Sequence, residues 1–238
     1  MRDLLLAALL LSLLSGVVRG RDGCKGMQLH TADEGPGRPR ATEVVVEHKE
    51  RCAVQRLYVV AYATTLDKEG FCVTAASAAE HGYKLNIIGL SRADGFKDKW
   101  FLDRIAAMRD FVNNLPSDAL VLHVDAYDVL FNAPPHQLVS HLLDTEMGII
   151  FSAEKGCCAP KKDLMTGRNV CDRNWPPPSK PTAMPFLNAG VWMGRQAEVS
   201  RMLEMALEEA METEEYAVRI GSRTTYRKMG DQTLLCEL

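Results

Sequence analysis

The chain has 238 residues, of which 47% are hydrophobic and 25% are charged, and its formal net charge is −3 at pH 7. This length allows one large domain or two small ones around a sizeable core. The mildly acidic balance, without a polybasic run, argues against nucleic acid or an anionic membrane surface as a partner.

The first twenty residues have the pattern of a signal peptide. A Leu-rich run from Leu4 to Val18 follows a short polar start and leads to Arg19-Gly20. The run is shorter than the roughly 20 residues that a spanning helix needs, and no second run of that length follows. We therefore expect delivery to the secretory pathway, with residues 1–20 as signal peptide and no transmembrane span after it. Residues 21–55 are charged and Gly-rich, as in Glu34–Arg40, and are expected to form a flexible leader.

Seven cysteines fit an oxidising compartment, in which disulfides persist. The odd number leaves at least one cysteine without an internal partner, and no C-x-x-C pair supports a redox motif or a zinc ribbon. We expect disulfides among Cys157, Cys158 and Cys171, although the sequence leaves the connectivity open.

From Arg56 onward, strands and helices alternate. Arg56–Thr64 is expected as a buried strand, followed by a helix through about His81 and a strand over Lys84–Leu90. A strand, helix and strand in this order predict a right-handed crossover and a parallel pair. A helix from about Trp100 to Asn114 follows. Its apolar positions are Phe101, Ile105, Met108 and Val112.

The central stretch, Leu120–Phe131, is a buried strand that ends on two carboxylates, Asp125 and Asp128. A central strand of an α/β sheet meets solvent at such a point, where these folds bind ligands. Two carboxylates and a diphosphate are suitable ligands for a magnesium or manganese ion. Acids at strand ends also cap helices or fix turns, so the spacing alone leaves both interpretations open.

The second half of the chain continues the alternation. A helix is expected from His136 to about Leu143, and a strand over Met147–Ser152. Ala153–Thr182 is a long irregular insertion, either a lid or a disulfide-tied surface loop. Pro185–Gly194 is expected as a strand pair or a bend, and Gln196 to about Glu214 as an amphipathic helix. Its inward positions are Val199, Met202, Leu203, Ala206, Leu207 and Met211.

Several motifs are absent. No G-x-G-x-x-G follows the first strand and no G-x-x-x-x-G-K-[ST] occurs, which weakens dinucleotide and P-loop interpretations. A nucleotide bound through a metal ion fits the acid pair better.

Five segments carry a resemblance in the order in which they occur. They are Val60–Thr64, Asp125–Phe131, Phe151–Glu154, Phe186–Gly190 and Gly230–Gln232. From about Arg56 to its end, the chain resembles the glycosyltransferase domain of procollagen lysyl hydroxylases and the wider procollagen galactosyltransferase group.

The resemblance implies an α/β, GT-A-like Rossmann-type domain over residues 56–238, with a mostly parallel central sheet. It also implies a UDP-sugar donor, Mn²⁺ or another divalent cation, and transfer of galactose or glucose to a hydroxyl acceptor such as hydroxylysine of a collagen-like protein. Asp125 and Asp128 match the family's metal-binding acids, and Asp125 is also placed at the donor.

The resemblance assigns further roles around the donor. Ala63 and Thr64 would lie against the uridine, and Lys99 would reach the diphosphate. Asp231 corresponds to an aspartate near the donor sugar. If the transfer is inverting, Asp231 or Glu154 is the candidate base for the acceptor hydroxyl.

One departure from the family supports an alternative. The family completes its metal shell with a histidine in a later His-Gly segment, and the sequence ends at Leu238, which favours a C-terminally incomplete domain. A non-catalytic lumenal module or partner subunit of the endoplasmic reticulum or Golgi is therefore the alternative to an active transferase.

Overall fold

The structure is a computed structural model that describes residues 30–31, 39–48, 51–90, 100–155, 184 and 186–219. The expected signal peptide, most of the irregular insertion, Lys99 and Asp231 lie outside these described residues. The helices and strands discussed below all belong to the described part.

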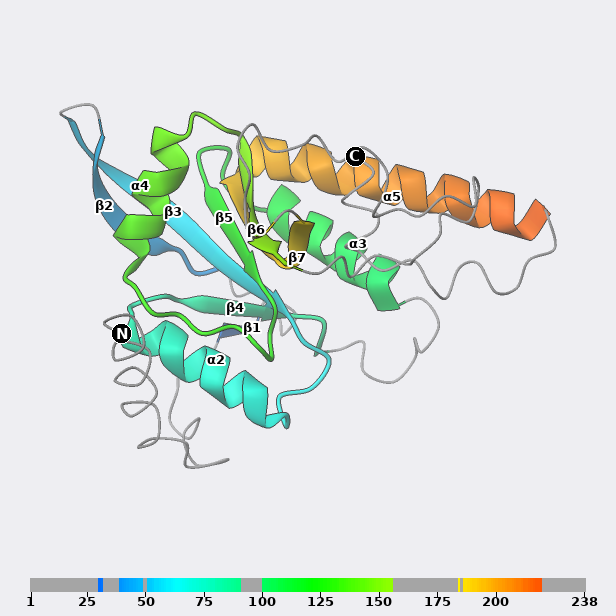
Figure 1. The fold of residues 1–238 in the computed structure, drawn as a ribbon, viewed down its shortest axis with the longest axis horizontal. Coiled ribbons are helices and arrows are strands. Elements are labelled where there is room, and N and C mark those ends of the chain that lie inside the picture. Colours follow the sequence, from blue (N-terminus) through cyan, green and yellow to red (C-terminus); the bar gives the residue numbers. More distant parts are fainter. Residues whose placement is uncertain are drawn as a thin grey trace, which may run out of the picture.

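A mixed sheet, parallel over its centre, organises the described chain (Figure 1). Six of its seven strands follow the order β1-β4-β3-β5-β7-β6, and the seventh, β2, pairs with β3 outside that path. The β1/β4, β4/β3 and β3/β5 pairs are parallel, whereas β5/β7, β7/β6 and β2/β3 are antiparallel. The strands are β1 His30–Thr31, β2 Thr42–His48, β3 Arg51–Tyr62, β4 Leu85–Ile88, β5 Leu120–Val124, β6 Ile149–Glu154 and β7 Phe186–Arg195.

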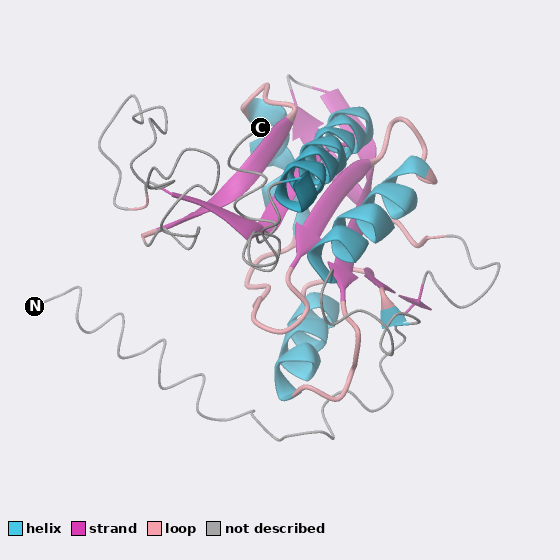
Figure 2. Cartoon of the chain, turned by 90° about the vertical axis from the view of Figure 1, so that its right-hand side faces the viewer, coloured by secondary structure: helices cyan, strands magenta, loops and turns pink. Residues whose placement is uncertain are grey.

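Helices cover both faces of this sheet and make three layers (Figures 1 and 2). The helices are α2 Glu69–Glu80, α3 Trp100–Asn113, α4 Pro135–Asp144 and α5 Gln196–Arg219. Buried residues of α2 and α4 share one hydrophobic cluster with the sheet. Those of α3 and α5 share a second cluster on the other face. The predicted α/β class is therefore observed, with a mixed sheet in which three of the six strand pairs are parallel.

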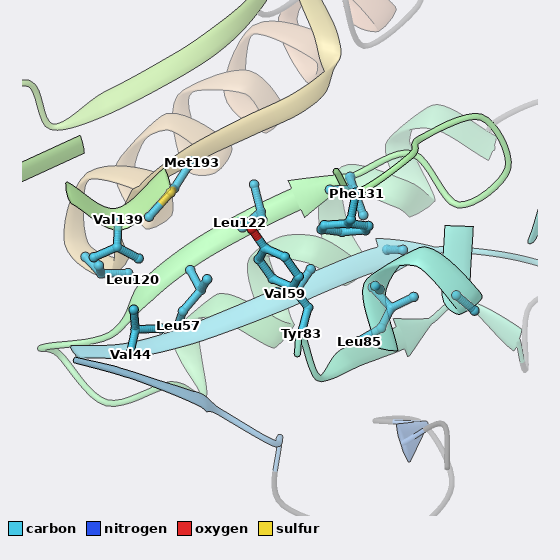
Figure 3. Packing of buried hydrophobic residues seen from close by; sticks show 14 of the residues in the cluster. Val44, Leu57, Val59, Tyr83, Leu85, Leu120, Leu122, Phe131, Val139 and Met193 are labelled. Atoms are coloured by element: carbon cyan, nitrogen blue, oxygen red, sulfur yellow. The ribbon is translucent and has the colours of Figure 1, made fainter. Parts of the chain in front are cut away.

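β5 and residues 57–61 of β3 are buried on both faces, which explains their largely apolar sequence. Leu57 and Val59 of β3 lie with Leu120 and Leu122 of β5 in the first cluster (Figure 3). The alternate residues, such as Val60, belong to the second cluster. This division follows from the two-residue period of a strand.

The prediction of a flexible leader over residues 21–55 is wrong for the last part of this segment. Residues 42–48 form β2, which pairs antiparallel with the first half of β3 from Thr42↔Leu57 to His48↔Arg51. Val44 and Val46 point into the core, each 2% exposed, whereas Val45 is exposed. An alternating apolar strand lies within a segment whose composition otherwise indicates a leader.

Helical periodicity predicted α3 and α5 well, with one error. Ile105, Met108 and Val112 of α3 are buried as expected. On α5, however, Met211 is 66% exposed and Ala210 takes the inward position. Ala210 continues the helical repeat of the buried residues before it, so the smaller residue, rather than the more apolar one, faces the core.

Candidate functional site

The predicted donor residues lie where β3 and β5 end side by side. These neighbouring strands are parallel, with Val60 opposite His123, so their carboxyl ends meet at one edge of the sheet. Ala63 and Thr64 follow β3, and Asp125 follows β5. The structure therefore brings three of the predicted site residues to the same edge, where α/β folds form ligand crevices.

The turn over residues 125–128 is held from three sides. The Asp125 amide donates to the Gly190 carbonyl of β7 at 2.7 Å. The Tyr127 hydroxyl donates to the Thr65 carbonyl at 3.0 Å, which ties the turn to the loop after β3. The Lys68 ammonium lies 4.1 Å from the centre of the Tyr127 ring. The turn is thus a supported part of the fold, and it presents the exposed Asp128 to solvent.

The first turn of α2 approaches this segment closely enough to require a glycine. A Cβ at Gly70 would lie 2.9 Å from the Tyr127 carbonyl carbon and 3.3 Å from its Cα, and closer still to the carbonyl oxygen. Because these are backbone atoms, they cannot move aside as a flexible side chain would. Gly70 therefore allows the helix to pack directly on the acid-bearing turn.

Asp125 belongs to a polar network that the sequence did not reveal. One guanidinium nitrogen of Arg104, on α3, donates to Asp125 Oδ1 at 2.7 Å and to His123 Nε2 at 2.6 Å. Arginine has no acceptor, so His123 accepts this bond and is neutral. Burial, followed by the charge of Arg104, holds the pKa of His123 well below its ordinary value.

Glu154 lies at the end of β6 and contacts the strand that also touches Asp125. The Asn188 amide of β7 donates to Glu154 Oε2 at 3.3 Å, while its Oδ1 accepts from the Gly190 amide at 2.9 Å. The Ser152 hydroxyl donates to the same Oδ1 at 3.1 Å. Asn188 therefore links Glu154 to the position that faces Asp125.

Gly190 allows the Asp125 carboxylate to pack directly against the backbone of β7. A Cβ there would lie 3.1 Å from Asp125 Cγ and 3.0 Å from Asn188 Oδ1, and it would collide with Asp125 Oδ2. Asp125 and Asn188 consequently face the same side of β7, and with Glu154 they form a row of oxygen-bearing side chains across β5, β7 and β6. We call these three residues the polar row.

The residues present suit a hard divalent cation bound together with a nucleotide. Carboxylates are the preferred ligands of such an ion. The described residues contain no group of three or more His, Cys, Asp or Glu side chains arranged to hold a metal ion. A cation at Asp125 and Asp128 would therefore need oxygens from its substrate to complete its shell.

Sequence reasoning missed three members of this site. His123 lies two positions before Asp125 on the same strand, and the two-residue period could have placed both on one face. Asn188 belongs to a segment that carries the resemblance, but the resemblance does not imply a role for this residue. Nothing in the sequence pairs Arg104 with Asp125, because that contact depends on how α3 is rotated against the sheet.

A family model described as the PLOD GT domain matches residues 53–216. The chain belongs to this glycosyltransferase family. Its match begins within β3 and ends within α5, so it covers the whole candidate site described above. The predicted glycosyltransferase family is therefore confirmed.

Comparisons with individual proteins add less than the family does. No curated protein matches the chain. One similar solved structure is described as "crystal structure of a glycosyltransferase involved in the glycosylation of the major capsid of PBCV-1". It has 12% sequence identity and a TM-score of 0.30, over 64% of this chain and 65% of that one. The chain thus spans less than two thirds of the length of that glycosyltransferase. In the described part of the chain, no helix combines the length and apolar character that crossing a membrane requires.

Proposed function

We propose that this PLOD-type glycosyltransferase domain transfers a hexose, galactose or glucose, from a UDP-sugar to a hydroxyl acceptor. Hydroxylysine of a collagen-like protein is the acceptor that the family suggests. The observation that carries the proposal is the position of Asp125, which follows a central strand of a glycosyltransferase domain and shares one edge with Ala63, Thr64 and, across β7, Glu154.

In this proposal, Asp125 and Asp128 hold Mn²⁺ or another divalent cation together with the diphosphate. A bound cation stabilises the negative charge that develops on departing UDP, an effect worth several kcal/mol. Ala63 and Thr64 are proposed to form the uridine side of the site. Ala63 is fully buried, and its amide donates to the Ile88 carbonyl at 2.9 Å, so it would fix the loop from below while the partly exposed Thr64 contacts the uridine. Lys99, outside the described residues, would reach the diphosphate.

The acceptor hydroxyl must lose a proton during an inverting transfer, and Glu154 is one candidate base. Its carboxylate is only partly buried and contacts Asn188, so it can both be oriented and reach an incoming hydroxyl. Asp231, outside the described residues, is the other candidate. Replacing each of these two acids by its amide would show which one is the base, because only replacement of the base should lower kcat without weakening donor binding.

We place the domain in the lumen of the secretory pathway, in the endoplasmic reticulum or Golgi, or outside the cell. The Leu-rich segment of residues 4–18 supports this location. So does Cys72 of α2, which is disulfide-bonded, since disulfides persist in oxidising compartments.

Ligand linkage tests the donor site directly. Mn²⁺ and UDP together at about 100 times their dissociation constant should stabilise the protein by about 2.7 kcal/mol. For a domain of this size that corresponds to a rise in Tm of about 5–11 °C. Asp128→Ala should abolish the rise. Asp110→Ala should retain it, because Asp110 is an exposed acid on α3 that pairs with neighbouring Arg109.

Absence of any shift with wild-type protein at millimolar ligand would contradict the proposed donor site. A normal shift without transfer to any hydroxyl acceptor would instead favour a non-catalytic lumenal module that binds the donor as a partner subunit. UDP release with collagen peptide and free galactosyl-hydroxylysine as acceptors distinguishes these two outcomes.

A further inference from the structure

We propose that Arg104, held in place by the buried His123, is a positioning residue that orients Asp125 and makes cation binding depend on the diphosphate. The inference rests on the proposed function, since it concerns the same donor site.

The geometry makes Arg104 a bridge between the core and the site. Its terminal nitrogen donates to both His123 Nε2 at 2.6 Å and Asp125 Oδ1 at 2.7 Å. Exposure to solvent rises from His123 to Asp125. His123 is 1% exposed, and the side chains of Arg104 and Asp125 are 13% and 35% exposed. The contact is therefore anchored inside the protein and ends at the solvent-facing carboxylate.

His123 provides an anchor that cannot easily move. It lies on β5 between Val60 of β3 and Trp192 of β7, with its ring centre 4.9 Å from the Trp192 ring. Its two flanking strands are themselves paired with further strands of the sheet. Because the ring is packed and buried, the acceptor atom for Arg104 is fixed before any ligand binds.

This arrangement determines which carboxylate oxygen of Asp125 faces the proposed cation. Arg104 binds Oδ1, and Oδ2 lies on the side of the carboxylate next to Gly190. A charge-assisted bond of this kind holds a carboxylate in one orientation more firmly than a neutral bond. Arg104 thus holds Asp125 with Oδ2 turned toward Gly190.

The positive charge of Arg104 has a second consequence. It partly neutralises Asp125 and repels a cation brought to the same carboxylate. The negative charges of a diphosphate would offset that repulsion. The site should therefore bind Mn²⁺ weakly alone and much more strongly with UDP.

The test compares Arg104→Gln, Arg104→Lys and Arg109→Gln, the last at a partly exposed position of the same helix. Free Mn²⁺ is measured by electron paramagnetic resonance with and without UDP, and kcat and KM are measured separately. Arg104→Gln should bind Mn²⁺ alone about tenfold more tightly, because the repulsion is removed. Its kcat should fall about tenfold or more, because the carboxylate loses its orientation. Arg109→Gln should match the wild type in both.

Arg104→Lys distinguishes the effect of the positive charge from the effect of the hydrogen-bond geometry. It also provides a test if Arg104→Gln does not fold. A lysine keeps the charge but presents a point donor rather than a planar fork, so Mn²⁺ affinity should stay as in the wild type while kcat falls. Unchanged Mn²⁺ affinity in Arg104→Gln, or wild-type kcat in Arg104→Lys, would overturn the inference and leave the proposed function intact. If the wild type binds neither Mn²⁺ nor UDP, the proposed function fails and this inference fails with it.

Discussion

Replacement of Gly190 by alanine should damage the candidate site more than its small size suggests. The added Cβ would lie 3.1 Å from Asp125 Cγ and 3.0 Å from Asn188 Oδ1, and nearer still to Asp125 Oδ2. The Asp125 carboxylate would have to rotate away, and its bond with Arg104 would be lost or weakened. The backbone itself accepts alanine, because Gly190 does not have a positive φ.

The magnitude follows from two opposing terms. Loss of a hydrogen bond between charged groups costs about 1.5–3 kcal/mol. Alanine in a strand regains about 0.5–1 kcal/mol relative to glycine. The net destabilisation is then about 0.5–2.5 kcal/mol, or a fall in Tm of about 1–10 °C for a domain of this size.

Thermal and urea unfolding of four proteins test this reasoning: the wild type, Gly190→Ala, Asp125→Ala and the double variant. In the Asp125→Ala background the colliding carboxylate is gone, so most of the cost of Gly190→Ala should disappear. An equal cost in both backgrounds, or no cost in either, would refute the proposed contact. Donor binding by Gly190→Ala should also weaken, measured as a smaller Tm rise with Mn²⁺ and UDP.

Three further predictions concern other parts of the site. Gly70→Ala should destabilise the protein by about 1–3 kcal/mol, because its Cβ meets the rigid backbone of Tyr127; wild-type stability in urea unfolding would contradict this packing. The depressed pKa of His123 means that, below its ordinary value of 6.5, the unfolded chain binds a proton that the folded chain does not. The free energy of unfolding without ligands should therefore fall by up to about 1.4 kcal/mol per pH unit below pH 6.5, and His123→Val should flatten that slope; an unchanged slope would show that other groups cause it. Glu154→Gln, which keeps an acceptor for Asn188, should lower kcat by about 10²–10⁴-fold with little change in donor KM if Glu154 is the base; full activity would assign the base elsewhere.

Local patterns in the sequence predicted most of the fold. The apolar runs that became β3, β4 and β5 are buried on both faces of the sheet, a position that leaves a continuous signal. The prediction of a leader failed over residues 42–48. This short alternating strand lies in a polar, Gly-rich context, and it is stabilised by its pairing with β3. The prediction that Met211 faces the core was wrong because it followed hydrophobicity alone, whereas Ala210 has the inward position on the helix.

The candidate site was predictable only in its strand-end residues. Asp125 and Asp128 were visible because acids after a buried strand have a local signature. Arg104 and Asn188 were not, because their roles come from contacts between α3 and β5 and between β6 and β7. Such contacts depend on tertiary packing, which no local spacing encodes.

Hexose transfer to a defined acceptor is the measurement that tests the central claim most directly. Wild-type protein, Asp125→Asn and Asp110→Ala would be incubated with Mn²⁺, UDP-galactose or UDP-glucose and a hydroxylysine-containing collagen peptide, and the products analysed by mass spectrometry. The wild type and Asp110→Ala should each add one hexose, and Asp125→Asn should add none. Equal transfer by Asp125→Asn, or no transfer by the wild type with either donor, would contradict it.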